Sequence, residues 1–482
     1  MVINNFDLLN IRLIAPELIL ICTAFILLML DLIIKRKEII AFTGVIGTLL
    51  SAFVSYKLYA SGVSDSAFGG MFIFDGYAYF FNLIFYISII LTIFISLKYM
   101  SVEKASLGEY YALLLFSSSG MMIMVGAADL IVLYLGLELM ALSTYILTGL
   151  LRTQLRSSEA ALKYFFLGAF SSAFLLYGIS LTYGLTGTTN LKDISSLLVA
   201  LDLTGNPVLL LGLIFIIVAF GFKIALVPFH MWAPDVYEGA PTSITAFMSV
   251  GPKAAAFAVM GRVLFVSFGA VHVQWASILI PLSVLSMAAG SIIALAQTNI
   301  KRMLAYSSIA HAGYALLGII TGTPEGLSST MNYLMIYTFM NIGAFAIIIL
   351  LRTKDFPCEN LEDFSGLAKN HPVISACMLI FMFSLTGIPP TAGFIGKFYV
   401  FMEIINAGYV SLVIIAVIFS VISAFFYLRV VMYMYMKEPK GEVALATSVP
   451  MSIALAVTVL MVIILGIFPD YLLRFAMFSI SG

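Results

Sequence analysis

Charged side chains stand inside long apolar stretches of this sequence, where their burial is energetically costly. These residues are Glu138, Lys163, Lys223, Lys253 and Lys397. A charge at the centre of a bilayer costs roughly 2.5–3.5 kcal/mol on insertion scales, so a chain that buries several is expected to use them. Burial disfavours the charged form of a lysine, and each neighbouring charge shifts this balance again. The pattern therefore predicts a row of groups that pass protons to one another.

Two histidines are further candidates for this row. His230 falls between Lys223 and Lys253 in the sequence, and an ordinary histidine titrates near pH 6.5. It suits a proton relay or a place at the membrane surface. His311 stands among small residues in SSIAHAGYA, where it either contacts water in a pathway or packs in the core. Arg429 and Glu403 lie nearer the expected helix ends, and we expect interfacial roles for both.

Glu138 and Lys163 fall on consecutive apolar stretches joined by a turn near residue 151. Such a turn places both side chains at similar depth, so we expect them to pair. One interpretation is that this pair belongs to the row of groups that pass protons. The other is a structural ion pair that joins two helices, because a buried pair alone is weak evidence for a function.

Prolines accompany three of the lysines and predict breaks in their helices. Pro228 follows Lys223, Gly251-Pro252 precedes Lys253, and Pro389-Pro390 precedes Lys397. A proline inside a helix removes a backbone donor and kinks or ends the helix. Broken backbone at membrane depth is tolerated only against protein or a water-filled cavity. We therefore expect water to reach these lysines at the breaks.

The composition is that of a membrane protein. Hydrophobic residues make up 62% of the 482 residues and charged residues 10%, with zero formal net charge. A soluble domain averages about 45–50% apolar and about 25% charged residues. The apolar runs are long enough to span as helices. Nothing in the charge balance suggests nucleic acid, and the scattered cysteines and histidines show no metal-binding spacing.

These runs predict an all-α membrane protein of about fourteen transmembrane helices. Two further segments, 190–203 and 358–370, are expected to lie at the membrane surface. The expected spans are 12–34, 39–58, 77–97, 109–128, 130–151, 160–184, 207–229, 242–267, 274–296, 303–322, 329–351, 373–403, 410–435 and 449–472.

Loop charges predict the orientation, because lysine and arginine gather in cytoplasmic loops. One set of loops carries most of the basic residues, and we expect it to be cytoplasmic. It comprises Lys35, Arg36, Lys37, Lys98, Lys104, Arg152, Arg156, Lys301, Arg302, Arg352, Lys354, Lys369, Lys437 and Lys440. The opposite side carries Arg12, Lys57, Lys192, Arg262 and Arg474. Both termini are then expected on the outer, periplasmic side of a bacterial inner membrane.

The two proline-broken spans indicate an internal repeat. Phe222 to Pro228 aligns with Phe383 to Pro389. Each copy would hold five spans, and an odd number inverts the second copy, as in many transporters with discontinuous helices. The expected units are an N-terminal three-helix block at 1–105, a first repeat at 106–270, an inverted second repeat at 271–436, and C-terminal helix 14 at 437–482.

The sequence resembles a known family in three stretches. VPFHMWAPDVYEGAPTSITAFMSVGPKAAAFA at 227–258, IKRMLAYSSIAHAGY at 300–314 and TGIPPTAGFIGKFYVF at 386–401 are similar to the antiporter-like membrane subunits of respiratory complex I. Within that family the chain looks most similar to the subunit N group of bacterial NADH–quinone oxidoreductases. The first stretch is highly specific for the superfamily and less specific for the subunit.

The resemblance implies a role for each charged residue. Glu138 would begin the charged axis, Lys163 would tune it, Lys223 would lie at the first broken helix, Lys253 would form the central link, and Lys397 would end it. The chain would translocate protons without redox chemistry or a cofactor of its own. NADH, FMN, iron–sulfur clusters and a quinone would act through other subunits, and the partners would be other membrane-arm subunits, both antiporter-like and small-helix ones, within the lipid bilayer.

Two rival interpretations remain. A subunit of a multisubunit sodium/proton antiporter of the same superfamily would carry the same helices and charges without a redox partner. A structural or assembly subunit would use the charges only as ion pairs.

Overall fold

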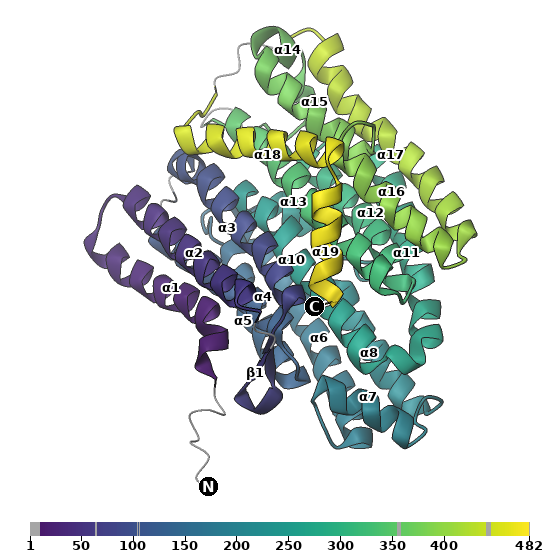
Figure 1. Cartoon of the computed structure of the whole chain (residues 1–482). Helices are drawn as coiled ribbons and strands as arrows, with labels where there is room; N and C mark the ends of the chain where they lie inside the picture. The colour runs from purple at the N-terminus through teal and green to yellow at the C-terminus, as the bar shows by residue number, and fades with distance from the viewer. Residues whose placement is uncertain are drawn as a thin grey trace.

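The computed structural model describes residues 10–62, 65–103, 105, 107–353, 358–439 and 445–481, and helices dominate it (Figure 1). Lys104, Lys354 and Lys440, which entered the expected orientation, lie outside these residues. In chain order the elements are η1 (Ile11–Ile14), α1 (Ala15–Ile33), α2 (Lys37–Ala60), β1 (Asp65–Ala67), η2 (Phe68–Gly70), β2 (Phe72–Phe74), α3 (Gly76–Val102), α4 (Gly108–Gly126), α5 (Leu130–Thr148), α6 (Leu155–Thr186), α7 (Leu191–Ala200), α8 (Pro207–Lys223), α9 (Trp232–Gly239), α10 (Thr242–Arg262), η3 (Val263–Ser267), η4 (Gly269–Val271), α11 (His272–Leu295), α12 (Ile300–Ile320), α13 (Pro324–Leu351), η5 (Leu361–Phe364), α14 (Leu367–Asn370), α15 (Pro372–Thr386), α16 (Ala392–Asn406), α17 (Val410–Met436), α18 (Val449–Ile467) and α19 (Asp470–Ser481).

The helices have the length and composition of membrane spans. Among the described residues, eleven helices are long and apolar enough to cross a membrane, and α8 and α15 are shorter apolar helices. Helices suit lipid because each backbone N–H and C=O finds its partner within the same segment. The predicted class, an all-α membrane protein, is confirmed.

Two of the three expected helix breaks are present. The span expected at 207–229 ends at Lys223 and resumes as α9 at Trp232, and the span expected at 373–403 is divided into α15 and α16. The expected break at Gly251-Pro252 is wrong, because α10 continues through Pro252 and ends in the π-helical turn η3. Every residue of α10 is buried, so packing on all sides holds this helix together although proline removes one backbone bond.

Small elements escaped prediction. Residues 65–74 form a two-stranded antiparallel hairpin, in which Asp65 lies opposite Phe74. The C-terminal segment, expected as a single helix, contains α18 and α19. Strands of three residues and a short terminal helix carry too few residues to give a clear periodic signal.

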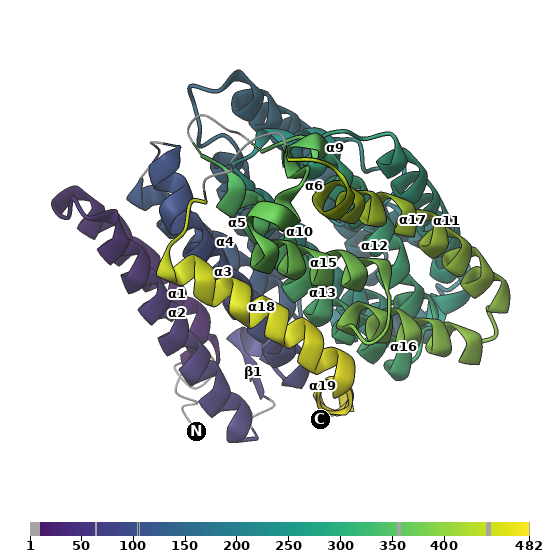
Figure 2. The same cartoon turned by 90° about the horizontal axis from the view of Figure 1, so that it is seen from above.

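The most buried helices lie at the centre of the bundle. All of the apolar window of α13 is buried, as is 94% of that of α12, whereas 39% is buried in the first span, which contains α1. Figures 1 and 2 show α1 and α2 at one edge of the bundle and α11 and α17 at the opposite edge. Helix α18 packs across α3, α13, α15 and α16. The central helices therefore place their side chains away from lipid.

Two loop contacts far apart in the sequence have the same backbone pattern. Residues 128–130 exchange a pair of N–H···O=C bonds of 2.9 Å with residues 189–191. Residues 298–300 exchange an equivalent pair, of 2.8 and 2.9 Å, with residues 359–361. In both cases the first segment leads into a long helix, α5 or α12, whose N-cap side chain is Asp129 or Asn299.

Candidate functional site

Glu138 lies at the α5–α6 contact. Its side chain is half-buried and accepts a hydrogen bond from the hydroxyl of Ser172 on α6. Tyr145 lies two turns further along α5, where its hydroxyl approaches Lys223. Glu138 also interacts electrostatically with Lys223. The carboxylate therefore faces the first broken helix.

Lys223 is the last residue of α8, at the first break. It is 4% exposed, and its Nζ donates to the Tyr145 hydroxyl at 3.2 Å. The indole N–H of Trp232, beyond the break, donates to the Phe222 carbonyl at 2.9 Å. The same carbonyl also accepts from the backbone N–H of Ala225 at 3.0 Å, so both bonds fix the end of α8. Lys223 stands in the last turn of α8, where positive charge is favourable.

Lys163 is not paired with Glu138, contrary to the prediction. Its Nζ contacts Glu159 at 2.7 Å and Asp235 at 2.8 Å, and its side chain is 41% exposed. The physical reason is the stagger of α5 and α6, which brings Glu138 level with Ser172 instead of with Lys163. Lys163 therefore lies near the polar end of its helix, and Ser172, more than two turns further on, is the residue that meets Glu138.

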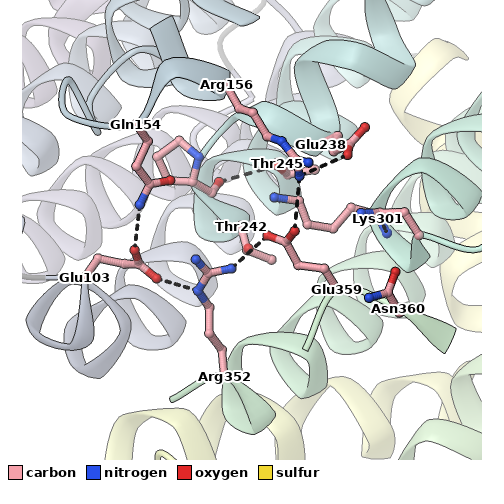
Figure 3. A network of polar contacts seen from close by, with 12 residues as sticks. Glu103, Gln154, Arg156, Glu238, Thr242, Thr245, Lys301, Arg352, Glu359 and Asn360 are labelled. Carbon is pink, nitrogen blue, oxygen red and sulfur yellow. Dashed lines mark hydrogen bonds and ion pairs between the residues drawn. The ribbon is translucent and has the colours of Figure 1, made fainter. Parts of the chain in front are cut away.

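The carboxylates around Lys163 belong to an extended polar network at one end of the bundle, which we call the end network. Figure 3 shows much of it, with Glu103 between Gln154 and Arg352, and Glu359 between Arg352 and Arg156. Arg302 extends the end network, because it pairs with Glu238 at 2.8 Å and with Asp235 at 2.7 Å. Burial alone would raise the pKa of Asp235, but hydrogen bonds from Lys163 and Arg302 hold that pKa below its ordinary value.

A cavity of about 180 Å³ opens within the end network. It is lined by acidic and basic side chains from α6, α9 and α12. They are Arg156, Glu159, Lys163, Asp235, Glu238 and Arg302, together with Ala160 and Gly239. This is a polar mouth at the end of the bundle where α9 follows the first break.

Lys253 lies in the middle of α10 and is 3% exposed. Its Nζ donates to the backbone carbonyl of Ser308 at 3.1 Å and contacts the hydroxyl of the same residue. Its ammonium also lies 5.7 Å from the centre of the Tyr237 ring. Lys253 forms no ion pair among the described residues, so only neutral oxygens and a ring face compensate its charge.

His311 lies one turn beyond Ser308 on α12 and is 3% exposed. Its Nδ1 is 2.5 Å from the Tyr333 hydroxyl and its Nε2 is 3.0 Å from the Tyr427 hydroxyl. The ring interacts electrostatically with both Lys253 and Lys397. Both ring nitrogens have a tyrosine hydroxyl within hydrogen-bond distance.

Lys397 lies on α16 just beyond the second break and is 5% exposed. Its Nζ donates to the carbonyls of Leu385 and Thr386 at 3.3 and 2.8 Å, and to the Ser420 hydroxyl at 2.9 Å. The two carbonyls belong to the last turn of α15. Lys397 thus places a cation at a helix C-terminus, as Lys223 does at the end of α8.

His230 lies in the segment between α8 and α9, apart from the lysines in its hydrogen bonding. It is 9% exposed, and its Nδ1 has no hydrogen-bond partner among the described residues.

Arg429 donates to the carbonyls of Leu295 and Gln297 at 2.8 and 2.6 Å, so it caps the C-terminal end of α11.

The sequence did not single out the neutral partners of the lysines. These are Tyr145, Ser308 and Ser420, and the sequence did not single out Tyr333 and Tyr427, the partners of His311, either. A signal existed for one of them, because Ser308 precedes His311 by three residues and so shares its helix face. The tyrosines come from other helices, and their spacing gave no sign of the contacts.

Comparisons with known proteins agree with this arrangement. A family model described as NADH:quinone oxidoreductase/Mrp antiporter, TM, matches residues 127–423. NADH-quinone oxidoreductase subunit N 2 of Rhizobium meliloti is 49% identical, with 97% of each chain covered. Subunit N of Trichlorobacter lovleyi is 46% identical over 98% of this chain and 97% of its own.

Solved structures share the fold. A chain of respiratory complex I from Thermus thermophilus with bound Aureothin superposes with a TM-score of 0.80 at 30% identity, covering 95% of this chain and 98% of that one. A chain of the Mrp complex from Dietzia sp. has a TM-score of 0.84 at 18% identity, with 97% of each chain covered, so it shows the fold alone.

The fold and the buried lysines define a polytopic membrane subunit of the antiporter-like class. This chain belongs to the NADH:quinone oxidoreductase/Mrp antiporter family, and the full-length relatives above are named as subunit N of NADH-quinone oxidoreductases. The resemblance stated from the sequence is confirmed.

Proposed function

We propose that this chain is the proton-translocating subunit N of a bacterial NADH–quinone oxidoreductase, a translocase that couples NADH oxidation and quinone reduction to proton pumping. The observation that carries the proposal is the chemistry around Lys223, Lys253 and Lys397. Each is at least 95% buried, and each contacts neutral oxygens rather than a carboxylate among the described residues. An ammonium without a paired carboxylate can lose its charge without leaving a buried anion behind.

The neutral partners suit proton transfer. A deprotonated lysine keeps two N–H donors and gains a lone pair, so Lys253 can hold Ser308 in either state and accept a proton again. A neutral imidazole has one donor and one acceptor nitrogen. His311, with a tyrosine hydroxyl at each ring nitrogen, therefore provides a hydrogen-bonded step between Lys253 and Lys397.

At each of the two helix breaks, the charge of a buried lysine is stabilised by the end of a helix. Lys223 and Lys397 place positive charge at the C-terminal ends of α8 and α15, where unsatisfied carbonyls favour a cation. Glu138 supplies a negative charge that acts on Lys223 across the α5–α8 contact. We infer that a change in the charge of Glu138 shifts the proton affinity of Lys223 first, and of Lys253 and Lys397 in turn.

Lys163 has a different place in this proposal from the one expected. It lines the polar cavity of about 180 Å³ with Asp235 and Arg302. A water molecule occupies about 30 Å³ in the liquid, so the cavity has room for several. We infer that Lys163 acts on protons that enter the chain through this cavity. We infer also that protons reach His230, in the segment between α8 and α9, from the same end of the bundle.

We also propose the topology expected from the sequence, with fourteen spans, an inverted repeat and both termini on the outer side. The eleven long apolar helices, with α4, α8–α9 and α15–α16, supply the fourteen spans. The matching backbone contacts of 128–130 with 189–191 and of 298–300 with 359–361 support two equivalent five-helix units. One contact precedes α5 and the other α12, and the loop charges place these points on opposite sides of the membrane, as an inverted repeat requires. Both termini then lie on the periplasmic side of the inner membrane.

The redox chemistry is assigned to other subunits. No group of three or more His, Cys, Asp or Glu side chains arranged to hold a metal is found in the part of the chain that the structure describes. NADH, FMN, iron–sulfur clusters and the quinone, ubiquinone or another, would act elsewhere in the complex. The partners would be other antiporter-like and small-helix subunits of its membrane arm.

The experiment is the measurement of protons translocated per NADH oxidised in membranes that carry Lys223→Ala. We expect an assembled complex with a lower proton-to-electron ratio and slower coupled quinone reduction. The matched control is Lys192→Ala, which removes an exposed lysine on α7. An unchanged ratio in assembled Lys223→Ala complex would contradict the proposal.

The alternative is a subunit of a multisubunit sodium/proton antiporter. The fold shared with the Mrp complex chain favours it, although at lower identity than the subunit N relatives. Purification through a tag on this chain separates the two proposals. Flavin and NADH oxidation in the purified complex support the oxidoreductase, whereas sodium-driven proton exchange without flavin supports the antiporter.

A further inference from the structure

The N-terminal helices α1, α2 and α3 enclose a carboxyl group that the lysine row does not use. Glu17, in the first turn of α1, is 1% exposed. Neither of its carboxyl oxygens has a hydrogen-bond partner among the residues described. No basic side chain forms an ion pair with it in the same set of residues. A buried charge in this condition is strongly disfavoured, because neither a partner nor water compensates it.

Polar side chains from the two neighbouring helices surround this carboxyl group. Ser51 on α2 donates to the carbonyl of Pro16, the residue before Glu17, at 2.7 Å. The Ser51 and Tyr86 hydroxyls are 2.9 Å apart, and Tyr86 interacts electrostatically with Glu17. Because Ser51 gives its hydrogen to Pro16, Tyr86 is the donor to Ser51 and keeps its own lone pairs available.

Two more buried polar groups lie one helical turn away on the same faces. Ser55 follows Ser51 by four residues, and Asn82 precedes Tyr86 by four residues, so each pair shares a helix face. The Ser55 hydroxyl and both polar atoms of the Asn82 amide lack a partner within the described ranges. Unsatisfied buried polar groups are rare in native proteins and call for an explanation. Several in one cluster, around a carboxyl group, indicate a site that exchanges a small ligand.

Other titratable groups on the packed elements lie elsewhere. Arg12 on η1 and Lys57 on α2 are exposed. Asp31 pairs with Lys37 at 2.5 Å at the far end of α1, and Gly108 lies against Asp31, which places the start of α4 and its Glu109 at that end too. Within the described ranges, Tyr86 is therefore the titratable group that interacts with Glu17.

We propose that Glu17 is a second proton-binding site of this chain, separate from the lysine row. In its neutral form the carboxyl group would donate towards Tyr86 and so join the chain of hydroxyls from Tyr86 through Ser51 to the Pro16 carbonyl. The ligand is a proton, because a single carboxyl group without a basic partner is neutralised by one positive charge and its neighbours are neutral hydroxyls and an amide. Figures 1 and 2 show α1 at one edge of the bundle, and the hydroxyl groups near Glu17 are not the ones that contact Lys223, Lys253 or Lys397, so the site does not rest on the proposed function.

The test is labelling with dicyclohexylcarbodiimide, which adds to protonated carboxyl groups in apolar surroundings. The intact complex in native membranes is treated across a range of pH, and the adduct on the Glu17 peptide is measured by mass spectrometry. We expect labelling at neutral pH that falls as the pH rises, no change with added Na⁺, and none in Glu17→Gln. Glu325 is the matched control, because it also follows a proline in the first turn of a helix but is exposed. It should not label.

A second measurement does not depend on reagent access. Gln has the shape of the neutral acid, so Glu17→Gln should assemble and denature thermally like the unmodified chain. A large fall in the denaturation temperature would show that the negative charge of Glu17 itself stabilises the packing of α1, α2 and α3, and would overturn the proposal. Protection of Glu17 from the reagent by Na⁺ at constant pH would also overturn it, since the occupant would then be Na⁺. Neither result depends on whether Lys223 carries protons.

Discussion

Replacement of Lys253 by methionine should separate proton transport from stability. Lys253 is 3% exposed, and among the described residues its ammonium contacts Ser308 and the face of Tyr237. The change removes hydrogen bonds from a charged donor, which are worth about 1.5–3 kcal/mol. It also removes a buried charge, and such replacements by apolar groups of similar size are often neutral or stabilising by about 1–4 kcal/mol.

These two effects oppose each other, so we expect the free energy of unfolding to change by less than about 2 kcal/mol. At about 2–4 °C per kcal/mol for a larger domain, the apparent denaturation temperature should shift by less than about 8 °C. Transport should fall much further. Loss of a proton-transfer group costs about 10²–10⁴-fold in rate.

The assay uses purified complex in proteoliposomes, with NADH oxidation and proton uptake measured together and with thermal denaturation at one heating rate. Lys301→Met is the matched control, because Lys301 is equally buried and donates to the Ala240 carbonyl at 3.2 Å. It interacts electrostatically with Glu359, Arg352, Glu238 and Glu103 rather than with the other buried lysines, so transport per assembled complex should persist when it is replaced. The reasoning fails if Lys253→Met pumps at the normal ratio, or if Lys301→Met blocks pumping in stable complex.

Two further perturbations test other parts of the structure. His311→Leu removes the hydrogen bonds to Tyr333 and Tyr427 and should slow proton uptake about 100-fold, whereas Tyr427→Phe, which keeps the Tyr333 bond, should have a smaller effect; equal rates in both variants would remove His311 from the pathway. Asp75→Asn breaks the two-pronged pair in which Arg262 donates twice at 2.8 Å, and should lower stability near neutral pH by about 3 kcal/mol, whereas the control Asp65→Asn, at an exposed residue of the hairpin that precedes Asp75, should not. Burial alone would raise the pKa of Asp75, but Arg262 holds that pKa below its ordinary value, so the stabilisation is present above the unfolded-state pKa and is lost as the pH falls through the lower folded-state pKa. Unfolding measured down to about pH 3 should therefore show less acid sensitivity in Asp75→Asn than in the unmodified chain.

The sequence was sufficient to find the buried lysines, because a charge inside an apolar run is visible without any contact. It also predicted the breaks after Lys223 and before Lys397, since the prolines that cause them are local. It failed at Lys163, because the stagger of α5 against α6, which brings Glu138 to Ser172, is set by packing and not by the length of the turn between them. It failed at Pro252, because burial on every side of α10 is a tertiary property.

The partners of the lysines and of His311 were beyond sequence reasoning for a different reason. Lys223 meets Tyr145 across 78 positions, and His311 meets Tyr427 across 116. Serine and tyrosine are common in membrane helices, so their presence marks nothing until the helices are placed side by side. The sequence does not mark Glu17 as unusual, because it stands at the beginning of its apolar run, and acidic residues are common in the first turn of a helix.

The central claim, that Lys223, Lys253 and Lys397 form one proton pathway, is tested most directly by the proton-to-electron ratio in single and combined variants. Residues that act as a unit are non-additive, since removal of any one already stops the step that they share. The ratio should fall to the same lower value in assembled Lys223→Ala, Lys253→Met and Lys397→Met complexes, and no further in the triple variant. Separate partial losses that sum in the triple variant, or a normal ratio in any single one, would contradict a single pathway.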